Sequence, residues 1–252
     1  MKLIILCFLA APLAVVGSNL IQPRSLEFET FDFKHLGSKD DFVQLQGLST
    51  REQVAVINDY MDVFLVELNG FIAEQGMDSM KLDDVGGKFG WTIFTGEMSL
   101  TNGIVKGLNS VARGGDVTLR YENTVLKASL PIKLENVNLN YNYAVKLMNL
   151  GPHGLLNGTV KGCRVLLQVQ IDLDTLLAKL DLYKLETLGD ISLKFQGGIL
   201  EWMVNLFVSV AIPLIKPVLN WAINTFTQGT VAGLIVKYND VITKLLESLN
   251  NM

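Results

Sequence analysis

The sequence predicts an α+β domain in which amphipathic helices at both ends of the chain cover an antiparallel sheet. Apolar residues recur at helical spacing over residues 49–75, alternate with polar residues through much of 92–195, and form one continuous side of residues 199–226. A period of 3.6 residues places side chains on one helix face, and a period of two places them on one strand face. Because helices and sheets bury their apolar faces against each other, the order helix, sheet, helices predicts one layered domain.

The first helix is predicted for residues 49–75. Ser49 with Glu52, and Thr50 with Gln53, each fit a capping box that satisfies free backbone donors of a first helical turn. Gly76 fits the position after a helix where a left-handed residue is common. The predicted buried face consists of Val54, Ile57, Met61, Phe64, Leu65, Leu68 and Ile72.

Strict alternation identifies the strands of the sheet. The alternating segments are residues 117–121, 126–134, 137–147, 165–173 and 191–195. Turns are expected at Asn102-Gly103, Gly114-Gly115, Glu122-Asn123 and Asn157-Gly158, and a loop at Gly86-Gly87 with Gly90. Short connections of this kind predict hairpins and therefore antiparallel pairing.

The C-terminal part predicts two helices, residues 199–226 and 231–249. In the first, the polar residues lie on one side, and Pro213 and Pro217 are expected to kink or split the helix because proline removes a backbone donor. Residues 202–223 are apolar enough to suggest a membrane span. Lys216 and the two prolines oppose that interpretation, since a central lysine costs roughly 2.5–3.5 kcal/mol on insertion, and a core helix is favoured.

The N-terminal residues predict a secreted protein. Residues 1–17 combine one positive charge, a short apolar run and small residues before Ser18, as in a secretory signal peptide. Residues 18–48 are interpreted as an extended arm, a propeptide or a tail, and residues 49–252 as a single domain. Removal of Cys7 leaves Cys163 alone, which excludes an internal disulfide and favours a buried free thiol. Asn157-Gly158-Thr159 is a glycosylation acceptor sequence.

The residues offer no recognisable catalytic or metal-binding motif. His35 and His153 have no partner at metal-ligand or catalytic-triad spacing, and the sequence contains no nucleophile elbow, phosphate loop or cysteine cluster. Asp172 and Asp174 are better explained as a solvated strand end than as an acid–base pair. The net charge of −4 disfavours nucleic-acid binding. We therefore expect a protein that is not an enzyme and has no cofactor.

Three segments carry a resemblance to a known family. Residues 102–119, with the sequence NGIVKGLNSVARGGDVTL, resemble a segment of the dust-mite group 7 allergens and their insect relatives. Residues 139–147, LNYNYAVKL, resemble the central strand of those proteins, and the helical end after Gly197-Gly198 is similar in its order of elements.

The resemblance implies membership of the tubular lipid-binding superfamily, which also includes takeout, juvenile-hormone-binding and bactericidal/permeability-increasing proteins. It implies a strongly curved antiparallel sheet wrapped around a long helix, half of a bactericidal/permeability-increasing-protein-like fold, with apolar ligands between sheet and helix. This chain departs from the takeout proteins in lacking an N-terminal disulfide, and from the bactericidal branch in being acidic. Both departures favour the mite-like branch.

The resulting expectation is a secreted, extracellular carrier of an apolar or lipid-like ligand. The 49% hydrophobic content, against 18% charged residues, indicates apolar surface that serves a ligand or a membrane. The expected lining comprises Leu139, Tyr141, Leu193, Phe207 and Trp221, with Lys216 or Asn220 as candidates for contact with a polar head group. Action on membrane surfaces or microbial lipids, and a surface-active structural role, remain as alternatives. The oligomeric state is left open.

Overall fold

The structure, a computed structural model, describes residues 53–91, 94–122, 124–147, 151–198 and 201–250. Within these residues the chain forms helices α2 (Asn58–Glu74) and α3 (Glu201–Asn250). The strands are β1 (Gln53–Val56), β2 (Ser79–Leu82), β3 (Val85–Trp91), β4 (Phe94–Lys106), β5 (Val111–Arg113), β6 (Thr118–Glu122), β7 (Val125–Leu134), β8 (Val137–Leu147), β9 (His153–Lys161), β10 (Cys163–Asp172), β11 (Ala178–Thr187) and β12 (Asp190–Gln196). The expected α+β class is confirmed, whereas the proposed signal peptide (1–17) and arm (18–48) lie outside the described residues.

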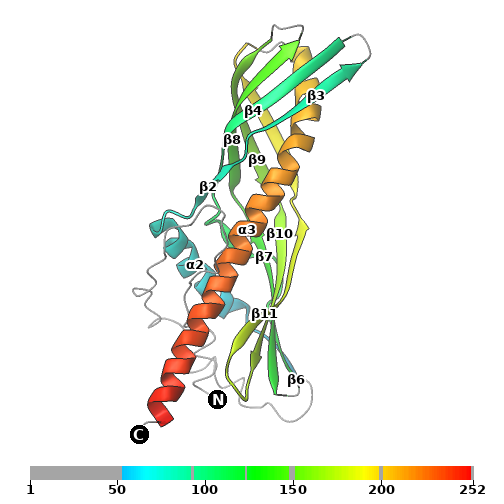
Figure 1. Ribbon diagram of the computed structural model, residues 1–252. Helices are drawn as coiled ribbons and strands as arrows, with labels where there is room; N and C mark the ends of the chain where they lie inside the picture. The colour runs from blue at the N-terminus through cyan, green and yellow to red at the C-terminus, as the bar shows by residue number, and fades with distance from the viewer. Residues whose placement is uncertain (1–52, 92–93, 123, 148–150, 199–200, 251–252) are drawn as a thin grey trace.

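The strands form two six-stranded sheets that follow each other along the molecule (Figure 1). The lower sheet has the order β1-β6-β7-β10-β11 with β5 beside β7, and the upper sheet has the order β12-β9-β8-β4-β2 with β3 beside β4. Every pair of strands is antiparallel, as the short connections predicted.

Three strands of the lower sheet continue directly into three strands of the upper sheet. β7 leads into β8 through residues 135–136, β9 leads into β10 through Gly162, and β11 leads into β12 through residues 188–189. Since β7, β10 and β11 are neighbours in one sheet and β8, β9 and β12 in the other, the interruptions fall side by side. The two sheets are therefore one long curved surface with a transverse break.

Two glycines at this break have left-handed backbones. Gly162 has φ +79° and Gly189 has φ +75°, values that side-chain-bearing residues adopt at a penalty. A Cβ atom on Gly189 would lie 2.0 Å from the Lys161 carbonyl oxygen, whereas one on Gly162 would meet nothing within 4 Å. The close approach at Gly189 lets neighbouring strands change direction together.

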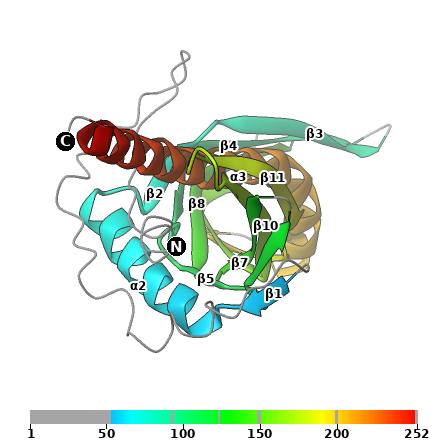
Figure 2. The same cartoon turned by 90° about the horizontal axis from the view of Figure 1, so that it is seen from below.

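Helix α3 runs along the whole length of the sheets (Figure 1). Its 50 residues span roughly 75 Å at 1.5 Å per residue, and it contacts β11 in the lower sheet as well as β2, β3, β4 and β12 in the upper sheet. Seen along the long axis, the strands curve around an interior, and α2 and α3 lie at the open side of that curve (Figure 2). This arrangement gives the interior one sheet-derived wall and two helical walls.

The expectation of two C-terminal helices was wrong, because α3 is continuous from Glu201 to Asn250 and contains Pro213 and Pro217. Both prolines lie on the exposed side of α3, where backbone carbonyls that lose their helical donor can bond to water. The buried face, which includes Ile215 and Leu219, packs without interruption. Packing against the sheet thus outweighs the loss of two backbone hydrogen bonds.

The predicted start of the first helix was also wrong. Helix α2 begins at Asn58, without a side-chain cap, and Gln53–Val56 instead forms β1 against β6. The expected capping pairs include Ser49 and Thr50, which lie outside the described residues. The C-terminal stop is confirmed, because Gly76 follows the helix with φ +65°.

Two Asn-Gly pairs that were expected to form turns lie inside strands. Asn157-Gly158 lies within β9, and Asn102-Gly103 lies within β4 at a shift of register. A Cβ atom on Gly158 would be 2.7 Å from Leu139, and one on Gly103 would be 2.3 Å from the Tyr141 ring. These glycines are needed because large side chains pack over the strand, which is a different use from a turn.

The other strand and turn predictions were confirmed in part. The alternating segments correspond to β6, β7, β8, β10 and β12, with β8 matching residue for residue. Gly114-Gly115 lies between β5 and β6, as expected for a turn. The glycine-rich segment around Gly86 forms strand β3 instead of a loop. Strands β2, β4, β5, β9 and β11 were not identified as separate strands.

Candidate ligand-binding cavity

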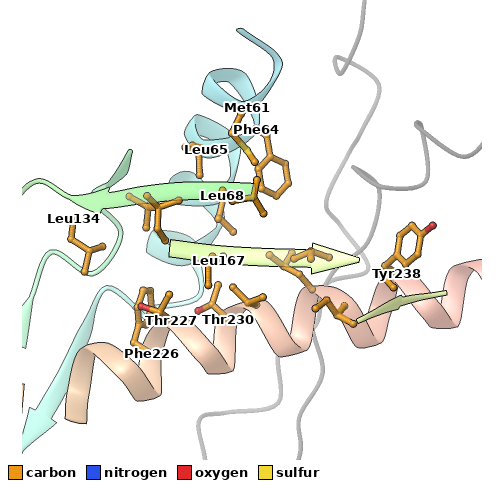
Figure 3. A pocket seen from close by; sticks show the side chains of 18 of the residues that line it. Met61, Phe64, Leu65, Leu68, Leu134, Leu167, Phe226, Thr227, Thr230 and Tyr238 are labelled. Carbon is orange, nitrogen blue, oxygen red and sulfur yellow. The ribbon is translucent and has the colours of Figure 1, made fainter. Parts of the chain in front are cut away.

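A partly enclosed cavity of about 130 Å³ lies between the lower sheet, α2 and the second half of α3 (Figure 3). Its walls are almost entirely apolar. Helix α2, strands β5, β7, β10 and β11, and helix α3 line it, through Met61, Phe64, Leu65, Leu68, Val111, Leu130, Ile132, Leu134, Leu167, Val169, Ile171, Ala178, Phe226, Thr227, Thr230, Val231, Leu234, Ile235 and Tyr238. No charged side chain contributes to this lining.

Polar contacts outside the cavity fix α2 against β5. The Asn69 side-chain amide donates to the Val111 carbonyl oxygen at 2.7 Å and accepts from the Val111 N–H at 3.1 Å. The guanidinium of Arg113 donates two hydrogen bonds of 2.9 Å to the carboxylate of Asp62, and this interaction lowers the pKa of Asp62. These contacts hold Met61 and its neighbours over the cavity.

A matching contact fixes α3 at the opposite edge of the lower sheet. The Ala178 N–H donates to the Asn239 side-chain oxygen at 2.8 Å, and the Asn239 amide donates to the Ala178 carbonyl oxygen at 3.0 Å. Val111 and Ala178 both line the cavity. An asparagine side chain thus attaches each of the two helices to the backbone of a strand residue, and that strand residue also borders the cavity.

The hydroxyl groups of the lining come from α3. Thr227 forms a hydrogen bond with Tyr183, whose own hydroxyl donates to the Asn224 side-chain oxygen at 2.6 Å. Burial raises the pKa of Tyr183 to about 12, so the phenol stays neutral and available as a donor. Thr230 and Tyr238 are the other lining residues that carry a hydroxyl group.

The residues expected to line a ligand site lie elsewhere. Leu139, Tyr141 and Leu193 are buried in the upper sheet, and Phe207 packs against it from α3. The Tyr141 hydroxyl donates to the Asp83 carbonyl oxygen at 2.9 Å, so its polar end is already satisfied within the fold.

The remaining expected contacts lie on α3. Trp221 is half-buried, and Lys216 and Asn220 are exposed. All seven expected lining residues are described by the structure, and none of them lines this cavity. A role for any of them in ligand binding stays a prediction. The stripe Leu234, Ile235 and Tyr238 on α3, together with the apolar face of α2, was visible in the sequence as amphipathic periodicity without a signal to separate cavity from core.

Asn157 also has a different setting from the one expected. It lies within β9 and accepts a hydrogen bond from the Asn140 side chain of neighbouring β8. Asn138, Asn140 and Asn142 are exposed along the same side of β8, so Asn157 belongs to the outer face of the sheet. Glycosylation at this position stays a prediction.

Cys163 is expected to be unreactive in the folded protein. The side chain is fully buried, and burial raises the pKa of its thiol to about 11 from the usual value of 9.0. Because only the thiolate reacts with disulfide reagents, the chain beginning at Ser18 should release no chromophore from 5,5′-dithiobis(2-nitrobenzoate) at pH 8 until guanidinium unfolds it. Equal rates in the folded and unfolded protein would contradict this burial.

The same shift makes stability depend on alkaline pH. The folded thiol keeps its proton up to a pKa of about 11, while the unfolded thiol loses it near 9.0. The unfolded chain therefore binds fewer protons between these values, and the thiol's contribution to stability, complete below pH 9, is lost as the pH rises toward 11.

Among the described residues, no group of three or more histidine, cysteine, aspartate or glutamate side chains could hold a metal ion. One stretch of the described helices, Met203–Lys244 within α3, is long and apolar enough to cross a membrane, a property it shares with core helices of soluble proteins.

Comparison with known proteins identifies the family. No curated protein matches the chain. Among solved structures, the crystal structure of Epiphyas postvittana Takeout 1 shares 16% identity, with 73% of this chain and 87% of that chain covered and a TM-score of 0.27. The family model for the Group 7 allergens matches residues 56–236, which include α2, all strands except β1, and most of α3. The chain belongs to the Group 7 allergen family.

Proposed function

We propose that this protein is an extracellular carrier that binds an apolar small molecule, or the apolar part of a lipid, in the cavity between the lower sheet, α2 and α3. The observation that carries the proposal is the lining, in which the polar side chains are limited to Thr227, Thr230 and Tyr238. Apolar burial contributes about 0.8 kcal/mol for each methylene group. A ligand can therefore bind here without a network of polar contacts.

The size of the cavity limits what it holds in this conformation. A volume of about 130 Å³ is close to that of an apolar protein cavity of about 150 Å³ that binds benzene. A ring or a short branched chain fits without rearrangement. A long acyl chain would need an outward displacement of α2, whose 17 residues form side-chain hydrogen bonds with the rest of the fold through Asn58, Asp62 and Asn69.

A tryptophan placed in the cavity is expected to block binding. In Val169→Trp, the indole fills the space between the lower sheet and the helices, and the affinity for toluene, a single-ring apolar probe that the cavity volume admits, should fall at least about tenfold, equivalent to about 1.4 kcal/mol. Val66→Trp is the matched control, because Val66 is 69% exposed on the outer side of α2. Calorimetric titration with toluene measures both affinities, and circular dichroism verifies folding.

The outcome separates this proposal from its alternative. Unchanged probe affinity in a folded Val169→Trp variant would show that apolar molecules bind elsewhere. A membrane-surface function is favoured by one observation, the exposure of Val54 and Val56 on β1 and of Val63 and Val66 on α2. Co-sedimentation of the protein with phosphatidylcholine vesicles, together with no uptake of the probe, would support that second function.

A further inference from the structure

One buried hydroxyl group in the cavity lacks a hydrogen-bond partner. Thr230 is 6% exposed and lines the cavity from α3, and its Oγ1 atom has no hydrogen bond within the described part of the chain. Figure 3 shows Thr227 and Thr230 on the side of α3 that faces the strands carrying Leu134 and Leu167. The hydroxyl is thus an unpaired polar group on a largely apolar surface.

This arrangement is unusual for a threonine within a helix. Such a hydroxyl commonly bonds to the carbonyl oxygen four residues earlier, and a buried polar group without a partner is destabilising. One turn earlier on the same face, Thr227 satisfies its hydroxyl through Tyr183. The fold therefore satisfies one of two neighbouring hydroxyl groups and leaves the other directed at the cavity.

We infer that the Thr230 hydroxyl binds the ligand's one polar atom, a neutral oxygen of a hydroxyl or carbonyl group on an otherwise apolar molecule. This inference rests on the proposed function. A threonine hydroxyl both donates and accepts, so it pairs with either group. An ionised carboxylate does not fit, because no charged side chain lines the cavity and an unpaired buried charge is strongly unfavourable.

The size of the cavity supports the same class of ligand. Its volume of about 130 Å³ holds a ring or a short branched chain. A lone water molecule is a poor alternative partner for Thr230, since buried waters are held by two to four polar groups and Thr227 is already bonded to Tyr183. The ligand class is therefore a small apolar alcohol, phenol or ketone.

The test compares phenol with toluene, which have similar shapes and differ in one hydroxyl group. Both are titrated calorimetrically into delipidated wild-type protein, Thr230→Val and Thr227→Val. A neutral hydrogen bond contributes about 0.5–1.5 kcal/mol net, so Thr230→Val should weaken phenol binding by about two- to tenfold and leave toluene binding equal or tighter. Thr227→Val should change the ratio of the two affinities little, because Thr227 bonds to Tyr183.

The outcomes separate the inference from the function on which it rests. If both molecules bind wild-type protein and the ratio of their affinities is the same in Thr230→Val, the inference is wrong and the cavity proposal stands. If neither binds, the proposed function fails and the inference fails with it. A second readout is thermal unfolding without ligand, where Thr230→Val should raise the midpoint and Thr227→Val should lower it; a lower midpoint in Thr230→Val would show that its hydroxyl is satisfied within the fold.

Discussion

Gly189→Ala is expected to destabilise the protein by more than about 4 kcal/mol, or to prevent folding. Gly189 has φ +75°, and a Cβ atom there would lie 2.0 Å from the Lys161 carbonyl oxygen and 2.7 Å from the Gly162 carbonyl carbon. These atoms belong to the backbone between β9 and β10, so they cannot rotate away as a side chain could. The substitution must therefore push the β11–β12 connection away from the β9–β10 connection at the junction of the two sheets. Urea unfolding followed by circular dichroism measures the effect.

Gly162→Ala is the matched control for this prediction. Gly162 lies at the same break with a nearly identical φ of +79°, but nothing lies within 4 Å of a Cβ atom there. Its effect should be limited to the backbone strain of a left-handed alanine, about 1–2 kcal/mol. Equal losses in the two variants would show that close strand approach at Gly189 contributes nothing beyond backbone strain.

Phe207→Ala is expected to cost about 3–5 kcal/mol of stability without weakening ligand binding in the cavity. Phe207 is fully buried, and its ring makes edge-on contacts with Phe89 at 6.3 Å and Phe195 at 6.0 Å between ring centroids. Phe195 in turn packs edge-on against Tyr143 at 5.0 Å. Truncation leaves a hole at the centre of this aromatic cluster, far along α3 from Thr227 and Thr230.

The neighbouring residue supplies the control. Leu206 is 38% exposed, so Leu206→Ala should change the free energy of unfolding by less than about 1 kcal/mol. Chemical unfolding gives the stabilities, and calorimetric titration with toluene gives the probe affinities. A large loss of probe affinity in Phe207→Ala, with stability intact, would instead support the sequence-based expectation that Phe207 lines the ligand site.

The fold was predictable where one side of an element is buried and the other is wet. Residues 137–147 alternate almost throughout, and β8 has the same bounds, with buried and exposed residues alternating from Val137 to Tyr143. Prediction failed where contacts with distant parts of the chain overrode the local sequence preference. Asn157-Gly158 resembles a turn in sequence, but Gly158 is required because Leu139 and Leu193 pack over it. The prolines of α3 resemble a helix end, but they lie on its exposed side.

The candidate site was less predictable than the fold, because a cavity and a core have the same composition. Tyr141 and Phe207 lie on the apolar faces of their predicted strand and helix, and such faces also form the packed upper half of the molecule. What distinguishes the lower half is a geometric mismatch between the curved sheet and the two helices. Periodicity places Leu68 or Leu234 on the inner face of a helix, but it does not report whether the opposite wall is close enough to touch.

Asn69 and Asn239 have a consequence for behaviour at high concentration. Each side-chain amide occupies both the N–H and the carbonyl oxygen of one strand residue, Val111 or Ala178. Unpaired edge groups are templates on which another molecule adds a strand, the first step toward aggregation. The amides present to β5 and β11 what a neighbouring strand would present, and each is fixed to a helix that cannot propagate a sheet. The same two residues that attach the cavity walls therefore also block strand addition at Val111 of β5 and at Ala178 of β11.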